Sequence, residues 1–350
     1  AERELDTIMY QDTGMYRNQQ YQKGVSATLQ SIYEENAILW DQELKYRPNF
    51  DVTDSVVTMP VIFAKVSGVK EGQVQPYWVG IKNRCERLLG KKELKGIYIG
   101  KDGYLFSENV EIADWDKLER KMKERFGKEK VSRIYVPAAG AVLGEKLPNF
   151  VSFYGREDAV FAHLLAHKEE DIYYRTDHHW TMLGAYYAYE AWATEQGMQP
   201  LKLSEMEYRV LKEDFLGTHY GKIHYAKQMD VMELYRPKVT CEVVYDLGES
   251  KISGLYQEEH LKTEDAYRFF LDGNHGVVEI TMEEGEGHLA VIKDSYANCL
   301  IPFLTAHYGK ITVIDPRYFR VDIGEWLSER EVTEVLILGQ DTSKVSFSDF

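Results

Sequence analysis

The chain has 350 residues, 44% of them hydrophobic and 28% charged, which suits one large α/β domain with or without an appendage. Its formal net charge of −15 argues against general nucleic-acid binding, which needs a basic face. No run of 18 apolar residues is present, so no segment is expected to span a membrane. Three separated cysteines without a CxxC pair indicate neither a zinc ribbon nor a disulfide framework.

The first part of the chain differs in composition from the rest. Residues 15–45 are polar and rich in Gln, Tyr and Glu, and residues 77–95 show helical spacing of apolar side chains. We therefore predict that residues 1–90 form an N-terminal extension that is mostly helical. Because the chain begins at Ala1 rather than Met, we also expect a targeting or anchoring segment upstream.

From residue 91 the pattern alternates between strands and helices. Residues 96–106 predict a hairpin that turns at Lys101-Asp102-Gly103, and residues 115–126 predict an amphipathic helix. A strand over 131–136, a helix over 158–170 and a strand over 171–175 follow. A further helix is expected from Thr181 to Gly197, which supplies a stop signal.

Residues 205–288 predict a β-rich insertion, with strands at 239–245 and 276–282. Three short apolar strands then follow at 289–293, 310–315 and 334–338, with helical stretches between them. Short apolar strands that alternate with helices are typical of a doubly wound, mostly parallel sheet. Residues 91–350 are therefore predicted to form an α/β domain.

Polar side chains cluster where these strands end. Ligands of such sheets bind beyond the carboxyl ends of the strands. The sequences found at those ends are Asp177-His178-His179-Trp180, Asp294-Ser295-Tyr296, Asp315-Pro316-Arg317 and Gly339-Gln340-Asp341. A lone serine between a strand and a helix is more often an N-cap than a nucleophile. A nucleophile, a base, a carboxylate and amide donors at one rim nevertheless favour acyl transfer.

Residues 174–181 (YRTDHHWT), followed by GAYY at 184–187, resemble the signature of the DHHW family of bacterial proteins. Residues 291–298 (VIKDSYAN), 314–318 (IDPRY) and 100–105 (GKDGYL) also match its pattern. The resemblance covers roughly residues 80–345. This family is similar to the alginate O-acetylation proteins and to SGNH hydrolases, in a permuted motif order in which an Asp-x-His pair precedes the serine.

The resemblance implies a catalytic triad in which Ser295 is the nucleophile, His179 the base and Asp177 the orienting carboxylate. It places Gly339 and Gln340 where SGNH enzymes carry an oxyanion donor, although Gln stands there in place of Asn. Arg317 corresponds less closely to a second donor. The implied activity is that of an O-acetyltransferase or acetylesterase that uses no cofactor and forms an acetyl-serine intermediate.

Three neighbouring residues have more than one interpretation. His178 is an alternative base, because adjacent side chains point apart and the sequence does not say which faces the serine. Trp180 and Tyr296 are candidate substrate-binding residues, with core packing as the alternative for both.

Two other functions compete with acyl transfer. Asp177, His178 and His179 are all metal-ligand types, and His163 with His167 has the i, i+4 spacing of paired ligands, but the glutamate of an HExxH motif is missing. We therefore predict no metal. The other alternative is a non-catalytic carbohydrate-binding or envelope-assembly protein on the same fold, which the 25 tyrosines suit.

The location and the partners follow from the resemblance alone. It implies a protein outside the cytoplasmic membrane, secreted or associated with the cell envelope, and peripheral or tethered through an upstream segment. The expected partners are a carbohydrate polymer as acceptor and an unidentified acetyl donor, with no nucleic acid.

Overall fold

The computed structural model describes residues 79–80, 82–84, 86–87, 90–108, 114–250, 252–341 and 344–347. The chain separates into two compact units, residues 1–95 with 220–225 and residues 96–219 with 226–350. In the first unit the described residues between 79 and 87 are helical, and β1 (Glu93–Leu94) is a short strand. Most of the predicted N-terminal extension lies outside the described residues, so its helical character and its boundary stay predictions.

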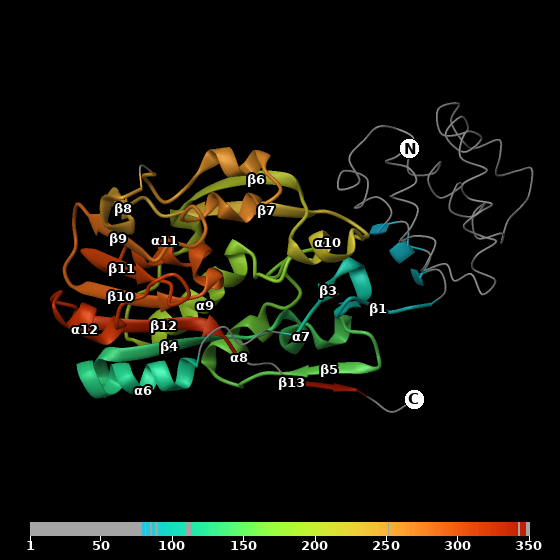
Figure 1. Cartoon of the computed structure of the whole chain (residues 1–350), viewed down its shortest axis with the longest axis horizontal. Helices are drawn as coiled ribbons and strands as arrows, with labels where there is room; N and C mark the ends of the chain where they lie inside the picture. Colours follow the sequence, from blue (N-terminus) through green and yellow to red (C-terminus); the bar gives the residue numbers. More distant parts are fainter. Residues whose placement is uncertain are drawn as a thin grey trace, which may run out of the picture. The chain divides into compact units, whose positions relative to one another are not determined.

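The second unit is built on a six-stranded sheet, whose order is β4-β12-β10-β11-β9-β8 (Figure 1). The first four strands are parallel, and β9 and β8 continue the sheet as antiparallel strands. Their bounds are β4 (Val131–Val136), β8 (Cys241–Tyr245), β9 (Val277–Met282), β10 (His288–Lys293), β11 (Lys310–Ile314) and β12 (Glu334–Gln340). The fold class is mixed α/β, as predicted.

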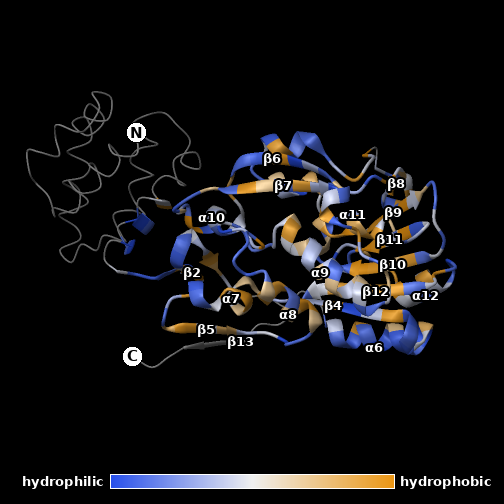
Figure 2. Ribbon diagram, turned by 180° about the vertical axis from the view of Figure 1, so that it is seen from behind, coloured by the Kyte–Doolittle hydropathy of each residue, from blue (hydrophilic) through white to orange (hydrophobic). Residues whose placement is uncertain are grey.

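Strand β10 lies at the centre of this sheet, and all six of its residues are buried. A strand with helices on both faces needs apolar side chains on both, which explains its continuous run of hydrophobic residues. Leu289 and Val291 face one core, which α9 (Met182–Glu195) covers. Ala290 and Ile292 face the other, which α6 (Trp115–Phe126) and α12 (Ile323–Ser328) cover. Figure 2 shows β10 and β11 as largely hydrophobic and α6 as largely hydrophilic.

The remaining elements connect or flank the sheet. Two small antiparallel pairs, β13 with β5 and β6 with β7, lie outside it. The strands not yet given are β2 (Ile97–Ile99), β3 (Leu105–Phe106), β5 (Val151–Tyr154), β6 (Glu207–Phe215), β7 (Asp230–Arg236) and β13 (Lys344–Phe347). The helices are α7 (Ala139–Val142), α8 (Ala159–Ala166), α10 (Thr218–Ile223), α11 (Ile301–Leu304) and the 3-10 turn η8 (Ser295–Cys299).

Most predicted elements are found at or near their predicted positions. The hairpin turns at residues 101–103, where Asp102 and Gly103 have φ angles of 52° and 82°. Helix α6 has its predicted bounds, and α9 begins after Thr181, whose hydroxyl accepts the N–H of Gly184. Gly197, with a φ of 73°, follows the end of α9, where a left-handed residue stops a helix.

Two predictions need correction. Residues 171–175 form a loop rather than a strand. Within the loop, Thr181 N–H donates to Ile172 C=O and Tyr174 N–H to His179 C=O, and Arg175 C=O accepts the N–H of Leu105 in β3, so the segment makes only single bonds and an isolated bridge. The predicted insertion is β-rich, but β8 and β9 belong to the central sheet, and only β6 and β7 form a separate hairpin. Within the described ranges, no helix combines the length and the apolar character needed to cross a membrane.

Candidate active site

The segment with the Asp-His-His-Trp sequence is a closed loop that leads into α9. Gly184, in the first turn of α9, packs against the Ile172 carbonyl, where an added Cβ would lie 2.1 Å from the oxygen. A glycine is therefore required for the helix to sit against the loop. The buried carboxylate of Asp230, at the start of β7, accepts the backbone N–H groups of Arg175 and Thr176 and the Thr176 hydroxyl. These three bonds fix the loop immediately before Asp177.

A continuous hydrogen-bonded chain joins Asp177, His179 and Ser295. Asp177 Oδ1 lies 2.5 Å from His179 Nδ1, and His179 Nε2 lies 2.8 Å from Ser295 Oγ. All three side chains are buried. Asp177 Oδ1 also accepts the His179 backbone N–H, and its Oδ2 accepts the N–H of Thr218 at 2.7 Å. The carboxylate is thus held from both sides, and it orients the imidazole toward the serine.

Ser295 is the first residue of η8, and only Asp294 separates it from the carboxyl end of β10. Asp294 caps this turn, because its carboxylate accepts the N–H of Tyr296 at 3.0 Å and that of Gln340 at 2.8 Å. The second bond joins the serine turn to the end of β12. These contacts tie two neighbouring strand ends to one carboxylate and so brace the serine turn.

Aromatic rings enclose the His179 imidazole. The Tyr267 ring stacks on it with a centroid distance of 3.9 Å and an interplanar angle of 10°. Tyr267 also points its hydroxyl toward the Ser295 carbonyl, at 3.4 Å. On the other side, the His178 ring lies 3.8 Å away, and Tyr296 meets the imidazole edge-on. This packing leaves the imidazole little freedom to rotate.

The electrostatics favour an ionised Asp177. Burial alone would raise the pKa of this carboxyl group, but the neighbouring His179 and His178 and the hydrogen bonds from His179 and Thr218 hold it well below its usual range. Asp294 behaves differently, because burial raises its pKa although two backbone N–H groups oppose the shift. Of the two carboxylates beside the serine turn, Asp177 is therefore the one most strongly held in its charged form.

A buried polar cluster lies beneath the serine turn. The Lys293 ammonium donates to Asn274 Oδ1 at 2.8 Å and to Asn298 Oδ1 at 2.7 Å, and it lies 3.4 Å from Asp315 Oδ2. Burial lowers the pKa of Lys293 to about 8. Because Asn298 belongs to η8, this network connects the serine turn with the ends of β10 and β11.

The predicted oxyanion residues have varied surroundings. Gln340 is buried beside the serine turn, and its Oε1 has no hydrogen-bond partner among the described residues. Gly339 packs on Trp115, where an added Cβ would lie 2.4 Å from the indole, so packing accounts for this glycine. Arg317 donates through Nε and Nη2 to Asp315. These bonds hold Asp315 in place, and the role of Arg317 as an oxyanion donor stays a prediction.

The predicted substrate-binding role of Trp180 and Tyr296 also needs correction, because both side chains are fully buried. The Trp180 indole N–H donates to the Tyr296 carbonyl at 2.9 Å, and the two rings meet at 90°. The Tyr296 hydroxyl donates to the His178 carbonyl at 2.5 Å. Both residues pack the loop of residues 171–181 against the serine turn, as the alternative of core packing predicted.

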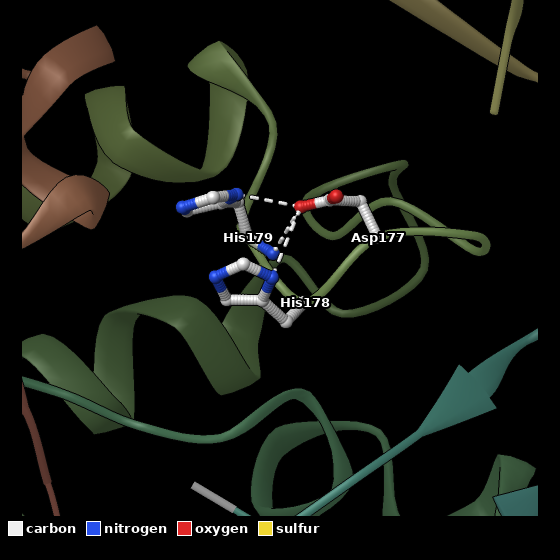
Figure 3. A group of neighbouring side chains, drawn as sticks. All are labelled: Asp177, His178 and His179. Atoms are coloured by element: carbon white, nitrogen blue, oxygen red, sulfur yellow. Dashed lines mark hydrogen bonds and ion pairs between the residues drawn. The ribbon is translucent and has the colours of Figure 1, made fainter. Parts of the chain in front are cut away.

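Figure 3 shows the group with metal-ligand chemistry, Asp177, His178 and His179, whose ligand atoms lie within 4.8 Å of one another. The Nδ1 atoms of both histidines face the same Asp177 oxygen, at 3.5 Å and 2.5 Å, and His179 Nε2 faces Ser295. The other predicted pair does not converge on one point: His163 bonds Glu190, and His167 bonds Glu170. Hydrogen bonds thus account for all four histidines.

Several residues of this site were not predicted. Thr218, Gly217 and Asp230 come from the predicted insertion, more than 30 residues after the motif, and their types are those of ordinary turns and strand starts. Gly217 packs so closely that an added Cβ would lie 2.3 Å from Asp177. Tyr267 is one of 25 tyrosines, and no spacing in the sequence distinguishes it from the others.

Comparison with known families supports the predicted resemblance. The model of the DHHW protein family matches residues 155–314, which include both the Asp-His-His-Trp loop and the serine turn. The resemblance to the DHHW family is therefore confirmed for this part of the chain. A second model, of the YceG domain, matches residues 30–129. No curated protein sequence matches the chain.

Solved structures with a similar fold include a DHHW family protein from Eubacterium siraeum, 25% identical, with a TM-score of 0.58. The alignment covers 71% of this chain and 91% of that protein. Bacillus cereus PatB1, solved with a sulfonyl adduct, is 18% identical, with a TM-score of 0.54 over 70% of this chain and 94% of its own. A second PatB1 structure gives 16% identity and the same TM-score, with coverages of 68% and 94%.

Proposed function

We propose that this protein is a serine-dependent O-acetyltransferase or acetylesterase of SGNH type, with its motifs in the permuted order. The observation that carries the proposal is the buried chain from Asp177 through His179 to Ser295 Oγ, with links of 2.5 and 2.8 Å. These are the contacts that a base needs in order to activate a serine hydroxyl. The DHHW family match covers all three residues.

In the first step, His179 Nε2 takes the proton of Ser295 Oγ, and the oxygen attacks the carbonyl carbon of an acetyl ester. Asp177 keeps the Nδ1 proton in place and stabilises the imidazolium that forms. His179 then protonates the leaving alcohol, and an acetyl group remains on Ser295. An acceptor hydroxyl or water reverses these proton movements and releases the acetyl group from the serine.

The tetrahedral intermediate needs donors for its oxyanion. We assign this role to the backbone N–H of Ser295, at the start of η8, with the side-chain amide of Gln340 as the second donor. Gln340 is held beside the turn by its own backbone bond to Asp294. One donor of this kind typically lowers the barrier by about 3 kcal/mol.

The proposed substrates are an acetyl donor and a carbohydrate polymer outside the cytoplasmic membrane, where the protein is secreted or held at the cell envelope. These assignments come from the resemblance to the alginate O-acetylation proteins. The net charge of −15 agrees with a partner other than nucleic acid. The chemistry needs no cofactor.

The two competing functions make different predictions about the site. A non-catalytic carbohydrate-binding protein on this fold has no need to keep Ser295 near either histidine, so the 2.8 Å contact with His179 favours the enzyme. A metal enzyme would have His179 Nε2 or Nδ1 facing a metal, whereas both nitrogens have hydrogen-bond partners in the proposed triad.

The test is the release of p-nitrophenol from p-nitrophenyl acetate by the purified protein and by three variants, Ser295→Ala, His179→Ala and His178→Ala. We expect Ser295→Ala and His179→Ala to lose the activity and His178→Ala to keep a part of it. Incubation with a chelator should leave the wild-type rate unchanged. Activity that survives Ser295→Ala would rule out the proposed mechanism, and activity that disappears with the chelator would support a metal enzyme instead.

A further inference from the structure

Of the three consecutive residues Asp177, His178 and His179, His178 is the one that the proposed triad does not use. Its side chain is 30% exposed, whereas the side chains of Asp177 and His179 are only 2% and 6% exposed. Its ring lies 3.8 Å from that of His179, so it is the part of the histidine pair that solvent and a substrate reach first.

The position of His178 is fixed by three contacts. Its Nδ1 lies 2.7 Å from the Thr218 hydroxyl and 3.5 Å from Asp177 Oδ1, and its carbonyl accepts the Tyr296 hydroxyl. Thr218 is shared between the two histidines, because its backbone N–H holds Asp177 while its hydroxyl holds His178. An exposed imidazole held in this way is oriented for binding rather than freely mobile.

Figure 3 shows how the two rings are oriented. The Nδ1 edge of each ring faces Asp177, and the Nε2 edges of both point away from it to the same side. Since His179 Nε2 faces Ser295 Oγ, His178 presents its own Nε2 next to the place where the acceptor hydroxyl must attack. Either tautomer of His178 can bind a hydroxyl there, because a hydroxyl group both donates and accepts.

We propose that His178 binds a second hydroxyl of the acceptor, next to the one that is acetylated, so that the site selects polyols with neighbouring hydroxyl groups, such as sugars. This inference rests on the proposed function. It assigns the two neighbouring imidazoles to two hydroxyls of the same molecule. His178 is then a specificity residue of the second half-reaction rather than a second base.

The first acceptor hydroxyl gives its proton to His179 Nε2 while its oxygen bonds to the carbonyl carbon of acetyl-Ser295. The bond between that carbon and Ser295 Oγ then breaks, and Oγ takes the proton back from His179. The neighbouring hydroxyl stays hydrogen-bonded to His178 throughout, which positions the acceptor for attack. Water has no second hydroxyl for His178 to bind and is not positioned in this way.

The experiment uses p-nitrophenyl acetate as donor and two matched acceptors, a vicinal cyclohexanediol and cyclohexanol, with acetylated products measured by mass spectrometry. Wild type should acetylate the diol about tenfold more efficiently per hydroxyl than the monoalcohol, which corresponds to about 1.4 kcal/mol, the upper end for one neutral hydrogen bond. His178→Phe keeps a ring against His179 and removes both nitrogens, so this preference should fall to about one.

Two further variants separate binding from folding. His178→Gln keeps a hydrogen-bonding group and should retain part of the preference for the diol. His163→Gln changes a histidine of similar exposure that bonds Glu190 between α8 and α9, and it should keep the full wild-type preference. If His178→Phe does not fold, Thr218→Val, which removes the hydroxyl that orients His178, should lower the same preference.

The outcomes distinguish the two proposals. A diol preference that is unchanged in His178→Phe, or a wild-type protein that hydrolyses the ester but transfers acetyl to neither acceptor, would overturn the role of His178. In both cases an ester hydrolysis that still depends on Ser295 would leave the proposed function standing. Hydrolysis that is independent of Ser295 would instead remove the proposed function.

Discussion

The replacement of Asp177 by Asn tests how the triad is held together. The carboxylate accepts three N–H groups: Oδ1 accepts those of His179 Nδ1 and the His179 backbone, and Oδ2 accepts that of Thr218. An asparagine has one acceptor oxygen and one NH2 group, so Asp177→Asn cannot satisfy both sides. In either orientation, an NH2 group faces a backbone N–H.

The two orientations of the amide have different consequences. With the oxygen toward His179, the Thr218 N–H is left unpaired in a buried place, at a cost of about 1–3 kcal/mol, and the charge that stabilises the imidazolium is lost. With the NH2 group toward His179, Nδ1 must accept, the proton moves to Nε2, and the imidazole can no longer take the Ser295 proton. The variant is therefore inactive when its amide has the second orientation.

We expect Asp177→Asn to lower kcat for p-nitrophenyl acetate about ten-thousand-fold, as the loss of the orienting carboxylate does in serine triads, which corresponds to a barrier about 5 kcal/mol higher. Asp214→Asn is the matched control, because Asp214 is exposed and pairs with Lys212. Its rate should equal that of wild type. A folded Asp177→Asn protein with a rate within tenfold of wild type would refute the role of Asp177.

Three further changes test the surroundings of the triad. Gly217→Ala places a Cβ 2.3 Å from the Asp177 side chain and should lower kcat/KM about a hundredfold, whereas Gly144→Ala, with open space around it, should match wild type. Asp230→Asn turns an NH2 group toward a buried N–H and should lower the free energy of unfolding in urea by about 1–3 kcal/mol; an unchanged midpoint would contradict this. Lys293 has a lower pKa in the folded protein than in the unfolded chain. Between pH 8 and 10.5 the unfolded chain therefore keeps a proton on Lys293 that the folded protein has lost, and the free energy of unfolding rises with pH in that window. At about 1.4 kcal/mol per pKa unit, the free energy of unfolding should rise by about 3 kcal/mol across this window. Lys293→Met should lack this rise. Equal pH slopes of the free energy of unfolding in the two proteins would contradict the prediction.

The sheet could be read from the sequence wherever a strand is buried on both faces. Residues 289–292 and 335–338 are short, continuous apolar runs, and both lie in central strands of the sheet. Residues 171–175 (Asp-Ile-Tyr-Tyr-Arg) also contain strand-forming side chains, but two of their backbone groups, the Ile172 carbonyl and the Tyr174 N–H, bond to residues 179–181 of the same loop. Hydrogen bonds between residues that are close in sequence compete with sheet formation there, and this competition cannot be predicted from the amino-acid composition of the segment.

The site could be predicted only in part, for a similar reason. Short sequence motifs predict Ser295, His179 and Asp177, because only a few residue types can act as nucleophile, base and orienting carboxylate. Thr218 and Tyr267 act through a backbone N–H and a ring face, which many residue types supply. Trp180 looked suited to stack on a sugar because of its ring, and only the packing of α9 against the serine turn shows that it is buried.

The most direct test of the account is to find which residue a sulfonyl fluoride modifies. Such reagents form a stable adduct with a serine that a neighbouring base has activated. After treatment with phenylmethanesulfonyl fluoride and proteolysis, mass spectrometry should place one sulfonyl group on Ser295, with loss of esterase activity in proportion. Ser295→Ala should remain unmodified, and His179→Ala should react far more slowly. Inactivation of the wild-type protein with the adduct on another residue, or with Ser295 unmodified, would contradict the assignment of Ser295 as the nucleophile.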